Sequence, residues 1–479
     1  HPQYPKELID PVTGKSLAGG NGSVRVRAQL KDFPGQGQDN VTDFGRYLAG
    51  VKGTVGNWDW ESAVMFNSSK VVSKASSAIL LTPFLDAYKN GTFIFGGSAQ
   101  NADLYKKIIT DTSSNFKSSM YLWDGKVTGE LMQLPAGPLS IAVGAEARRE
   151  ELEVNPDPLD VAGELYHRAV SEPGYKAGRN IASIYTELSV PIVKNVEAQL
   201  AARFDHYSDY GNSTTPKIGL KWTATPALLF RGTYSTGFRA PTLVENASGI
   251  KKAFTTFKDP ARCNGVFLEG CQDQSAYESG ANPNLKPETA KSFTLGMVFE
   301  PTSWLSGSID GWEIKRKDEI STYSLTSVLA NPGRYANNPA AVITRDPLTA
   351  ADQAAGATAG QITNIRMLLT NVALTQVRGI DLNLKGKFNL GEYGQLVPKM
   401  DVSYTHSYKY KPAVDEDAIE YASTRNLPKV QATLGAGWSK AAWDVSADVV
   451  YIGKQAMVED FTTECVFAQQ GYDSLCRDL

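Results

Sequence analysis

Cysteine and histidine are the side chains best suited to chemistry in this chain of 479 residues, which carries four of each. The cysteines form two local pairs, Cys263 with Cys271 and Cys465 with Cys476, and both pairs fall in long connections between predicted strands. Local pairs in loops favour disulfides formed in an oxidising compartment. Free thiols and a shared metal site are the alternatives, and the loop positions disfavour both.

Nucleophilic catalysis would need a nucleophile and a base within reach of each other. His167, His206 and His406 have no neighbouring Cys or Ser motif of that kind. Several carboxylates on polar strand faces could be imagined as acid–base pairs, namely Glu187, Glu197, Asp205, Asp381 and Asp444. These carboxylates are better explained as part of a water-exposed protein face that carries charges of both signs. The sequence therefore predicts no enzyme, no catalytic residue, and no bound metal or cofactor.

The elements that position these side chains are predicted strands, because apolar and polar residues alternate with a period of two. In the clearest pair, an alternating segment over 184–190 is joined by a short turn to a second over 196–204. About fourteen such segments lie between residues 43 and 455, and a weaker one at 23–31 would be the fifteenth. Each predicted strand has one apolar and one polar face, and no domain boundary interrupts the series.

Short and long connections alternate along the chain. The short turns lie near residues 56, 136, 194, 225, 302 and 441. The long connections cover 71–121, 154–179, 239–287, 319–370, 412–426 and 456–479. This asymmetry is typical of an outer-membrane barrel with tight turns at one rim and long loops at the other. A soluble all-β protein is the alternative, but it seldom places its long loops so consistently at one end.

Composition agrees with a membrane barrel. The sequence has no apolar run of about 18 residues, which argues against a transmembrane helix but not against transmembrane strands. Six of the eight tryptophans lie close to a short turn, as expected at a membrane–water interface: Trp58, Trp60, Trp222, Trp304, Trp438 and Trp443. The net charge of −3 gives no reason to expect nucleic acid as a partner.

One segment ends a long connection and enters a predicted strand directly. It consists of Asn282, Pro283, Asn284, Leu285, Lys286, Pro287 and Glu288. The two prolines fix φ and remove backbone donors, which suits the first residues of a strand. Glu288 has the parity of the polar, inner face.

This segment resembles the C-terminal barrel region of TonB-dependent outer-membrane receptors. Three other stretches agree with the resemblance: Gly-Phe-Arg-Ala-Pro-Thr at 237–242, which contains the inward-facing Arg239, the strand at 311–320, and Val-Arg-Gly-Ile-Asp-Leu at 377–382. Each motif is loose by itself, whereas their order and spacing together are specific.

The resemblance implies an all-β fold, an antiparallel transmembrane β-barrel in which residues 1–479 supply about 14–15 of about 22 strands. Nothing before residue 20 resembles the family's plug domain or energy-coupling box. We therefore expect the sequence to be a middle-to-late piece of a larger receptor. Its expected location is the outer membrane of a Gram-negative bacterium, in contact with outer-membrane lipid.

For members of this family the function is energy-dependent uptake of a scarce nutrient. The implied partners are a small nutrient ligand at the extracellular loops, a plug domain and the TonB energy-transducing complex, the last two outside this chain. The sequence does not choose among an iron chelate, cobalamin and an oligosaccharide. A passive porin or a surface-exposed adhesin is the alternative function. Loop aromatics could stack on a ligand or simply pack the loops together: Phe254, Phe257, Phe267, Tyr277, Tyr323 and Tyr335.

Overall fold

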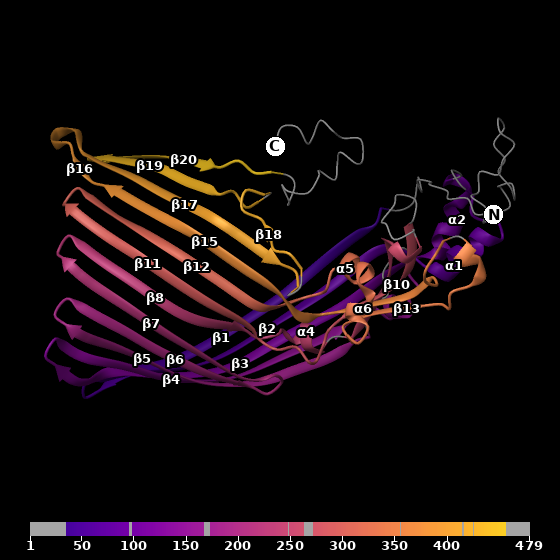
Figure 1. The fold of residues 1–479 in the computed structure, drawn as a ribbon, viewed down its shortest axis with the longest axis horizontal. Helices are drawn as coiled ribbons and strands as arrows, with labels where there is room; N and C mark the ends of the chain where they lie inside the picture. Colours follow the sequence, from indigo (N-terminus) through magenta and orange to yellow (C-terminus); the bar gives the residue numbers. More distant parts are fainter. Residues whose placement is uncertain are drawn as a thin grey trace.

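The computed structural model describes residues 35–94, 98–166, 173–247, 249–262, 272–354, 356–413, 416–424 and 426–456. Its main feature is one curved antiparallel sheet (Figure 1). Within the described residues, the path of this sheet contains fourteen strands in the order β1 (Gly37–Val55), β2 (Trp58–Ile79), β3 (Ile109–Leu134), β4 (Gly137–Asn155), β5 (Tyr175–Val193), β6 (Val196–Tyr207), β7 (Gly211–Thr225), β8 (Leu228–Arg239), β11 (Glu288–Thr302), β12 (Leu305–Ser321), β15 (Thr370–Gly386), β17 (Gln395–Lys411), β19 (Val430–Lys440) and β20 (Trp443–Ile452). The predicted all-β antiparallel fold and the main strand count are confirmed, while the weaker segment at 23–31 lies outside the described residues.

Alternation of side chains gives this sheet an apolar outer face and a polar inner face. Phe293 and Leu295 on β11 are 52% and 59% exposed, and Ile184, Leu200 and Phe204 are exposed on β5 and β6. Large apolar side chains left exposed so regularly have no protein interior to fill, and lipid is the medium that suits them. The predicted orientation of the apolar residues is therefore confirmed.

Tight turns join the strands at one end of the sheet, on the left in Figure 1. The turn between β1 and β2 contains Gly56, whose φ of +60° suits a residue without a Cβ. Aromatic side chains gather at this rim: Trp222 stacks on Phe230 with ring centroids 5.4 Å apart, and the Trp438 indole donates to the Tyr393 carbonyl at 2.7 Å. This arrangement fits the aromatic girdle of a membrane interface.

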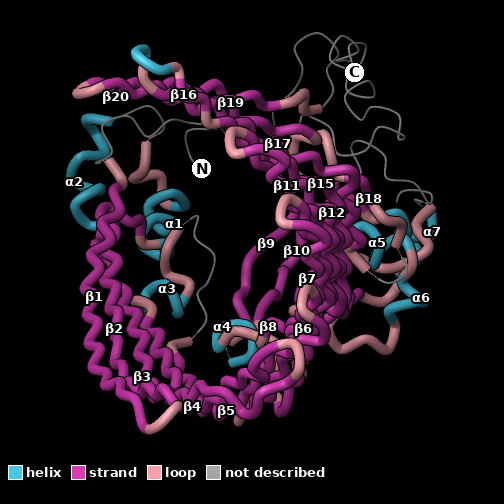
Figure 2. The backbone as a smooth tube through the Cα atoms, turned by 90° about the vertical axis from the view of Figure 1, so that its left-hand side faces the viewer, coloured by secondary structure: helices cyan, strands magenta, loops and turns pink. Residues whose placement is uncertain are grey.

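The wall formed by these strands curves but does not close within the described residues. There β1 pairs only with β2, and β20 pairs only with β19. Figure 2 shows the curved wall with β1 and β20 at its two free ends. No helix of the described residues is long and apolar enough to cross a bilayer.

The long connections lie at the opposite end and are partly folded. β2 continues to Ile79 and β3 starts at Ile109, so the connection predicted at 71–121 is shorter than expected. The strands extend past the apolar band. There both faces of the sheet contact water, so apolar and polar residues no longer alternate. Two connections share a small core around Phe84 and Phe93 and contain the helices α1 (Leu81–Lys89), α2 (Ser98–Ile108) and α3 (Pro158–Ala162).

A second folded unit, called here the loop sheet, combines the connections 239–287 and 319–370. Its strand order is β13 (Ala341–Arg345), β14 (Ile362–Leu368), β10 (Gln272–Gly280) and β9 (Ile250–Lys258). β10 and β14 are parallel, so the loop sheet ties two distant connections together. The same two connections contain short helices: α4 (Leu243–Ala247), η1 (Pro260–Arg262), α5 (Leu325–Ala330), α6 (Pro332–Tyr335) and α7 (Ala350–Ala354). The remaining short elements border β17: β16 (Phe388–Asn389), η2 (Gly391–Tyr393) and β18 (Ile419–Glu420).

Candidate functional site: the inner wall and its loop-covered mouth

The inner face of the wall carries charged side chains that are paired with one another. Asp205, only 2% exposed, accepts hydrogen bonds from Ser183 Oγ at 2.6 Å and from Arg203 Nε at 2.9 Å. Glu197 pairs with Lys221 at 3.5 Å, and Asp381 accepts from Ser403 Oγ at 2.7 Å. These carboxylates are bound by neighbouring donors as wall residues, which fits a water-lined lumen better than an acid–base pair.

The segment 282–288 crosses the mouth between the loop sheet and the wall. Asn282 donates from Nδ2 to the Leu369 carbonyl at 2.9 Å, and its backbone N–H donates to the Glu245 carbonyl at 3.0 Å. Leu285 is buried, whereas Pro283 and Asn284 are exposed. The Lys286 N–H donates to Asn371 Oδ1, and Asn371 Nδ2 returns a bond to the Lys286 carbonyl, both at 2.8 Å. The segment thus joins the start of β11 to the start of β15.

Arg239 and Glu288 form the centre of this junction. They are directly paired residues of β8 and β11, and Arg239 Nη2 donates to Glu288 Oε1 at 2.6 Å. The same oxygen accepts the Ile320 N–H from β12 at 2.8 Å. Arg239 also makes two bonds to the Glu245 carboxylate on α4, at 2.9 and 3.1 Å. One ion-pair cluster therefore connects three wall strands with a loop helix.

Glu245 lies outside the strands and holds the first turn of α4. The Thr242 N–H donates to Glu245 Oε2 at 2.7 Å, and the Glu245 N–H donates to Thr242 Oγ1 at 3.1 Å, which is a reciprocal helix cap. Burial opposes ionisation of Glu245, but the bonds from Arg239 and Thr242 outweigh it and hold the pKa of this carboxyl below its ordinary value. Glu245 is therefore an anion at neutral pH and a fixed partner for Arg239.

Arg179 on β5 binds the chain next to α4 from the other side. Its guanidinium, 9% exposed, donates to Glu150 Oε2 and to the Pro241 carbonyl, each at 2.7 Å, and lies 5.1 Å from the ring centroid of Tyr207. Asp209 accepts from Arg179 at 3.4 Å and from Asn246 of α4 at 3.3 Å. The short helix is thus held between two arginine clusters on the inner side of the wall.

Sequence reasoning found Arg239 and Glu288 but missed Arg179, Glu245 and Asn371. The spacing Thr242-x-x-Glu245 is a helix-capping signal that could have identified Glu245. Arg179 has the inward parity of β5, although parity alone does not mark it as a junction residue. No local pattern identifies Asn371, because its partners lie 85 and 53 positions away in the chain.

Most of the candidate ligand-binding aromatics pack inside the loop sheet. Phe257 and Tyr335 are buried in its core, and Tyr277 and Tyr323 pack against that core. For these four side chains the structure supports packing between the loops. Phe254 differs, because it is 76% exposed on the edge strand β9. Phe267 and the four cysteines lie outside the described residues.

An ion pair links the two edge strands of the loop sheet, because Arg345 ends β13 and Asp259 follows β9. Asp259, 1% exposed, receives two bonds from the Arg345 guanidinium at 2.5 and 2.9 Å. In Figure 1, β10 and β13 lie beyond the loop end of the wall, and in Figure 2 β9 and β10 lie within its outline. The loop sheet therefore overhangs the mouth of the lumen.

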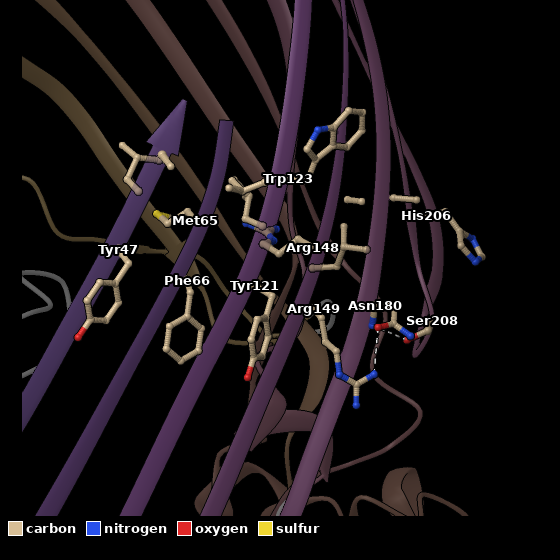
Figure 3. Close-up of a pocket in the computed structure, with 17 residues that line it drawn as sticks. Tyr47, Met65, Phe66, Tyr121, Trp123, Arg148, Arg149, Asn180, His206 and Ser208 are labelled. Atoms are coloured by element: carbon tan, nitrogen blue, oxygen red, sulfur yellow. Dashed lines mark hydrogen bonds between the residues drawn. The ribbon is translucent and has the colours of Figure 1, made fainter. Parts of the chain in front are cut away.

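A groove of about 980 Å³ lies on the outer face of the wall rather than at the mouth of the lumen. It contains a row of outward-facing aromatics, Tyr47, Phe66 and Tyr121, with Arg149 next in the row (Figure 3). Phe66 and Tyr121 have ring centroids 4.9 Å apart, and Arg149 donates to Asn180 at 3.1 Å. Aromatic residues followed by charges on the outer face mark the interface on the loop side.

Comparison with known proteins identifies the family. The family described as TonB dependent receptor-like, beta-barrel, matches residues 10–475. The chain belongs to this family. It is thus a chain of the outer membrane of a Gram-negative bacterium, in a family of receptors and transporters rather than enzymes.

Two curated relatives of this TonB-dependent receptor chain come from Vibrio cholerae and Acinetobacter baumannii. It is 22% identical over 232 residues to the iron-regulated outer membrane virulence protein of Vibrio cholerae, covering 48% of this chain and 30% of the relative. It is 25% identical over 170 residues to the probable TonB-dependent siderophore receptor PirA of Acinetobacter baumannii, covering 34% and 21%. The chain therefore matches less than a third of the length of these relatives.

Solved structures share the fold at low sequence identity. The siderophore receptor PirA from Acinetobacter baumannii superposes with a TM-score of 0.55 at 16% identity, covering 85% of this chain and 49% of that one. The RagAB peptide transporter superposes with a TM-score of 0.53 at 11% identity, covering 87% and 48%. The shared part is a barrel wall, and the chain spans about half the length of the solved proteins.

Proposed function

We propose that this TonB-dependent receptor chain forms the wall and extracellular loops of a transporter that takes up an iron chelate. The observation that carries the proposal is the loop sheet, a folded unit that overhangs a polar lumen and is clamped to the wall by Arg239, Glu288 and the segment 282–288. A passive pore has no evident need for such a unit. A small ligand held at a lumen mouth does need a fixed binding surface.

The choice of an iron chelate rests on the relatives, whose names refer to iron regulation and to siderophores. Cobalamin and oligosaccharides remain alternative cargo classes. Phe254 is our candidate for contact with the ligand, because a well-exposed aromatic ring on the edge strand β9 can stack on a chelator or a sugar. A plug domain and the TonB energy-transducing complex are the proposed partners outside residues 1–479.

Uptake by living cells tests the proposal. The native protein that contains this chain is expressed in a strain lacking other iron receptors, and labelled iron–siderophores, cobalamin and oligosaccharides are supplied in turn. We expect accumulation of an iron–siderophore that stops when a protonophore removes the proton gradient. Accumulation that continues with the protonophore would indicate a passive porin, and cell adherence without any uptake would indicate an adhesin.

A matched pair of substitutions tests the proposed contact. Phe254→Ala should weaken uptake at low ligand concentration, whereas Val342→Ala, at an exposed apolar residue on the opposite edge strand of the loop sheet, should leave uptake unchanged. Equal uptake by both variants and the wild type would remove Phe254 from the site while leaving the transport proposal standing.

A further inference from the structure

The outer face of β11 and β12 changes from apolar to basic over a very short distance. Along β11, the exposed Leu295 and Phe293 are followed, on the same face and toward the loops, by Lys291. Lys291 is directly opposite Lys315 of β12, and Lys317 is opposite Thr289. With Lys286 from the entry to β11, these residues form what we call the lysine belt.

The lysine belt is not neutralised by carboxylates of the described residues. None of its four lysines makes an ion pair with a carboxylate in the part of the chain that the structure describes. Like charges directly opposite each other, such as Lys291 and Lys315, destabilise a sheet unless an anion lies nearby. Glu313, one row closer to the apolar band, is already paired with Arg378 at 3.6 Å and with Gln376.

The same outer-face region on β3–β5 is organised differently. There Arg149 pairs with Glu151 at 2.8 Å, and Lys176 pairs with Glu153 at 3.0 Å. On β2 and β3, Lys70 and Lys117 also lie opposite each other, but each has an acidic residue opposite it on its other side, Asp43 and Glu153. Within the described residues, the lysines at this part of the rim therefore have a carboxylate on a neighbouring strand, whereas none of the residues paired with Lys291 and Lys315 is acidic. This contrast points to an anionic partner that the lysine belt receives from outside.

A groove adjoins the lysine belt and supplies neutral donors. It has a volume of about 900 Å³, and its lining includes Asn212, Thr214, Thr236 and Asn284 together with Lys286 and Lys291. Lys286, Lys291 and Asp318 are the charged residues of its lining, which therefore has a net charge of +1, and Lys315 and Lys317 lie on the neighbouring strand β12. Hydroxyl and amide groups beside cations are suited to a phosphate attached to a sugar or another polyol.

We propose that the lysine belt binds the phosphorylated headgroup of a lipid in the outer leaflet, with the acyl chains lying over Phe293 and Leu295. Charge complementarity and continuity with the apolar band both support this occupant. A soluble anion would gain nothing from the neighbouring apolar surface. The inference uses the outer-membrane location and is independent of which nutrient is transported.

Binding to defined lipid tests this site. The native protein that contains the chain, in detergent, is titrated with mixed micelles of a phosphorylated glycolipid, with the same glycolipid after removal of its phosphates, and with inorganic phosphate alone. The triple variant Lys291→Gln, Lys315→Gln, Lys317→Gln should bind the phosphorylated glycolipid about 100-fold more weakly, since each lysine near an anionic lipid surface contributes roughly fivefold. Replacing the same three lysines with arginine should preserve binding.

The matched control removes three outer-face lysines that do have acidic neighbours, Lys70, Lys117 and Lys176. It should bind like the wild type. Equal loss in the control, unchanged binding by the triple glutamine variant, or equal binding of the dephosphorylated lipid would overturn the proposal. Inorganic phosphate binding as tightly as the glycolipid would mean a free-anion site instead. If the triple variant fails to fold, the single variants Lys291→Gln and Lys315→Gln should each show the fivefold loss, and wild-type affinity in both would refute it.

Discussion

Removing the Glu288 carboxylate is the most direct perturbation of the junction between the wall and the loops. Glu288 Oε1 accepts from Arg239 at 2.6 Å and from the Ile320 N–H at 2.8 Å, and the side chain is only 8% exposed. Glu288→Ala deprives both donors of this acceptor at once. We expect the start of β11, the end of β12 and α4 to open more readily while the rest of the wall stays unchanged.

The magnitude follows from the two lost bonds. A poorly solvated N–H left without an acceptor costs about 1–3 kcal/mol, and a hydrogen bond to a charged group contributes about 1.5–3 kcal/mol. Arg239 is 42% exposed and keeps its bonds to Glu245, so its share is reduced by solvent. We therefore expect the local opening free energy to fall by about 2–3 kcal/mol, which corresponds to roughly 30- to 150-fold faster amide exchange.

Hydrogen-exchange mass spectrometry of the native protein in detergent measures this effect in peptides covering 236–247 and 316–322. The control is Glu313→Ala on β12. Its side chain is 41% exposed and its arginine partner is 3.6 Å away, and water can replace its bond from Gln376, so a change below about 1 kcal/mol is expected. Glu288→Gln keeps an oxygen for Ile320 and should give an intermediate rate. Exchange in Glu288→Ala equal to that of the wild type, or faster exchange spread over the whole wall, would refute the proposed role of this junction.

Four other outcomes are expected. Phe257→Ala should destabilise the loop sheet by about 3–5 kcal/mol, seen as faster proteolysis of its strands, whereas Phe254→Ala should leave proteolysis unchanged because its ring is exposed. The pKa of Asp352 is lowered from 3.8 to about 2 by bonds from Thr349 and Arg262, so its contribution to the loop sheet is complete above pH 3.8 and is lost as the pH falls toward 2; amide exchange near α7 measured across that range checks the sign. Peptide mapping without reductant should find the pairs Cys263–Cys271 and Cys465–Cys476, and any other pairing contradicts the reading of these loops. Residues 1–479 expressed alone should form no monodisperse monomer in detergent unless further strands or another chain pair with β1 and β20, which size-exclusion chromatography decides.

The wall could be predicted from sequence because its rules are local. Residues such as Leu295 and Ser292 face opposite media, and a period of two records this within a single strand. Antiparallel neighbours joined by short turns need no long-range information. The prediction placed the ends of β2 and β3 too close to the apolar band, because beyond it water lies on both faces and polar residues occupy both parities.

The loop sheet was not predictable in the same way. β10 and β14 pair in parallel, with Ala276 opposite Asn364, and nothing near either residue marks the other. Aromatic residues in these connections look the same in the sequence whether they contact a ligand or pack in a core. Only the packing of Phe257 and Tyr335 against Ile365 separates them from the exposed Phe254.

The segment 282–288 connects the loop sheet to the wall. Parallel pairing of β10 with β14 joins two long connections into one folded unit. If this unit were connected to the wall only through flexible chain segments, its orientation above the mouth would not be fixed. Asn282, Lys286 and Glu288 attach it instead to β8, β12 and β15 within a few residues. We infer that these contacts hold a surface such as Phe254 at a defined place above the lumen, so that little loop ordering is left to be completed when a ligand binds. We therefore propose that the residues that carried the family resemblance act by positioning the loop sheet rather than by contacting the ligand.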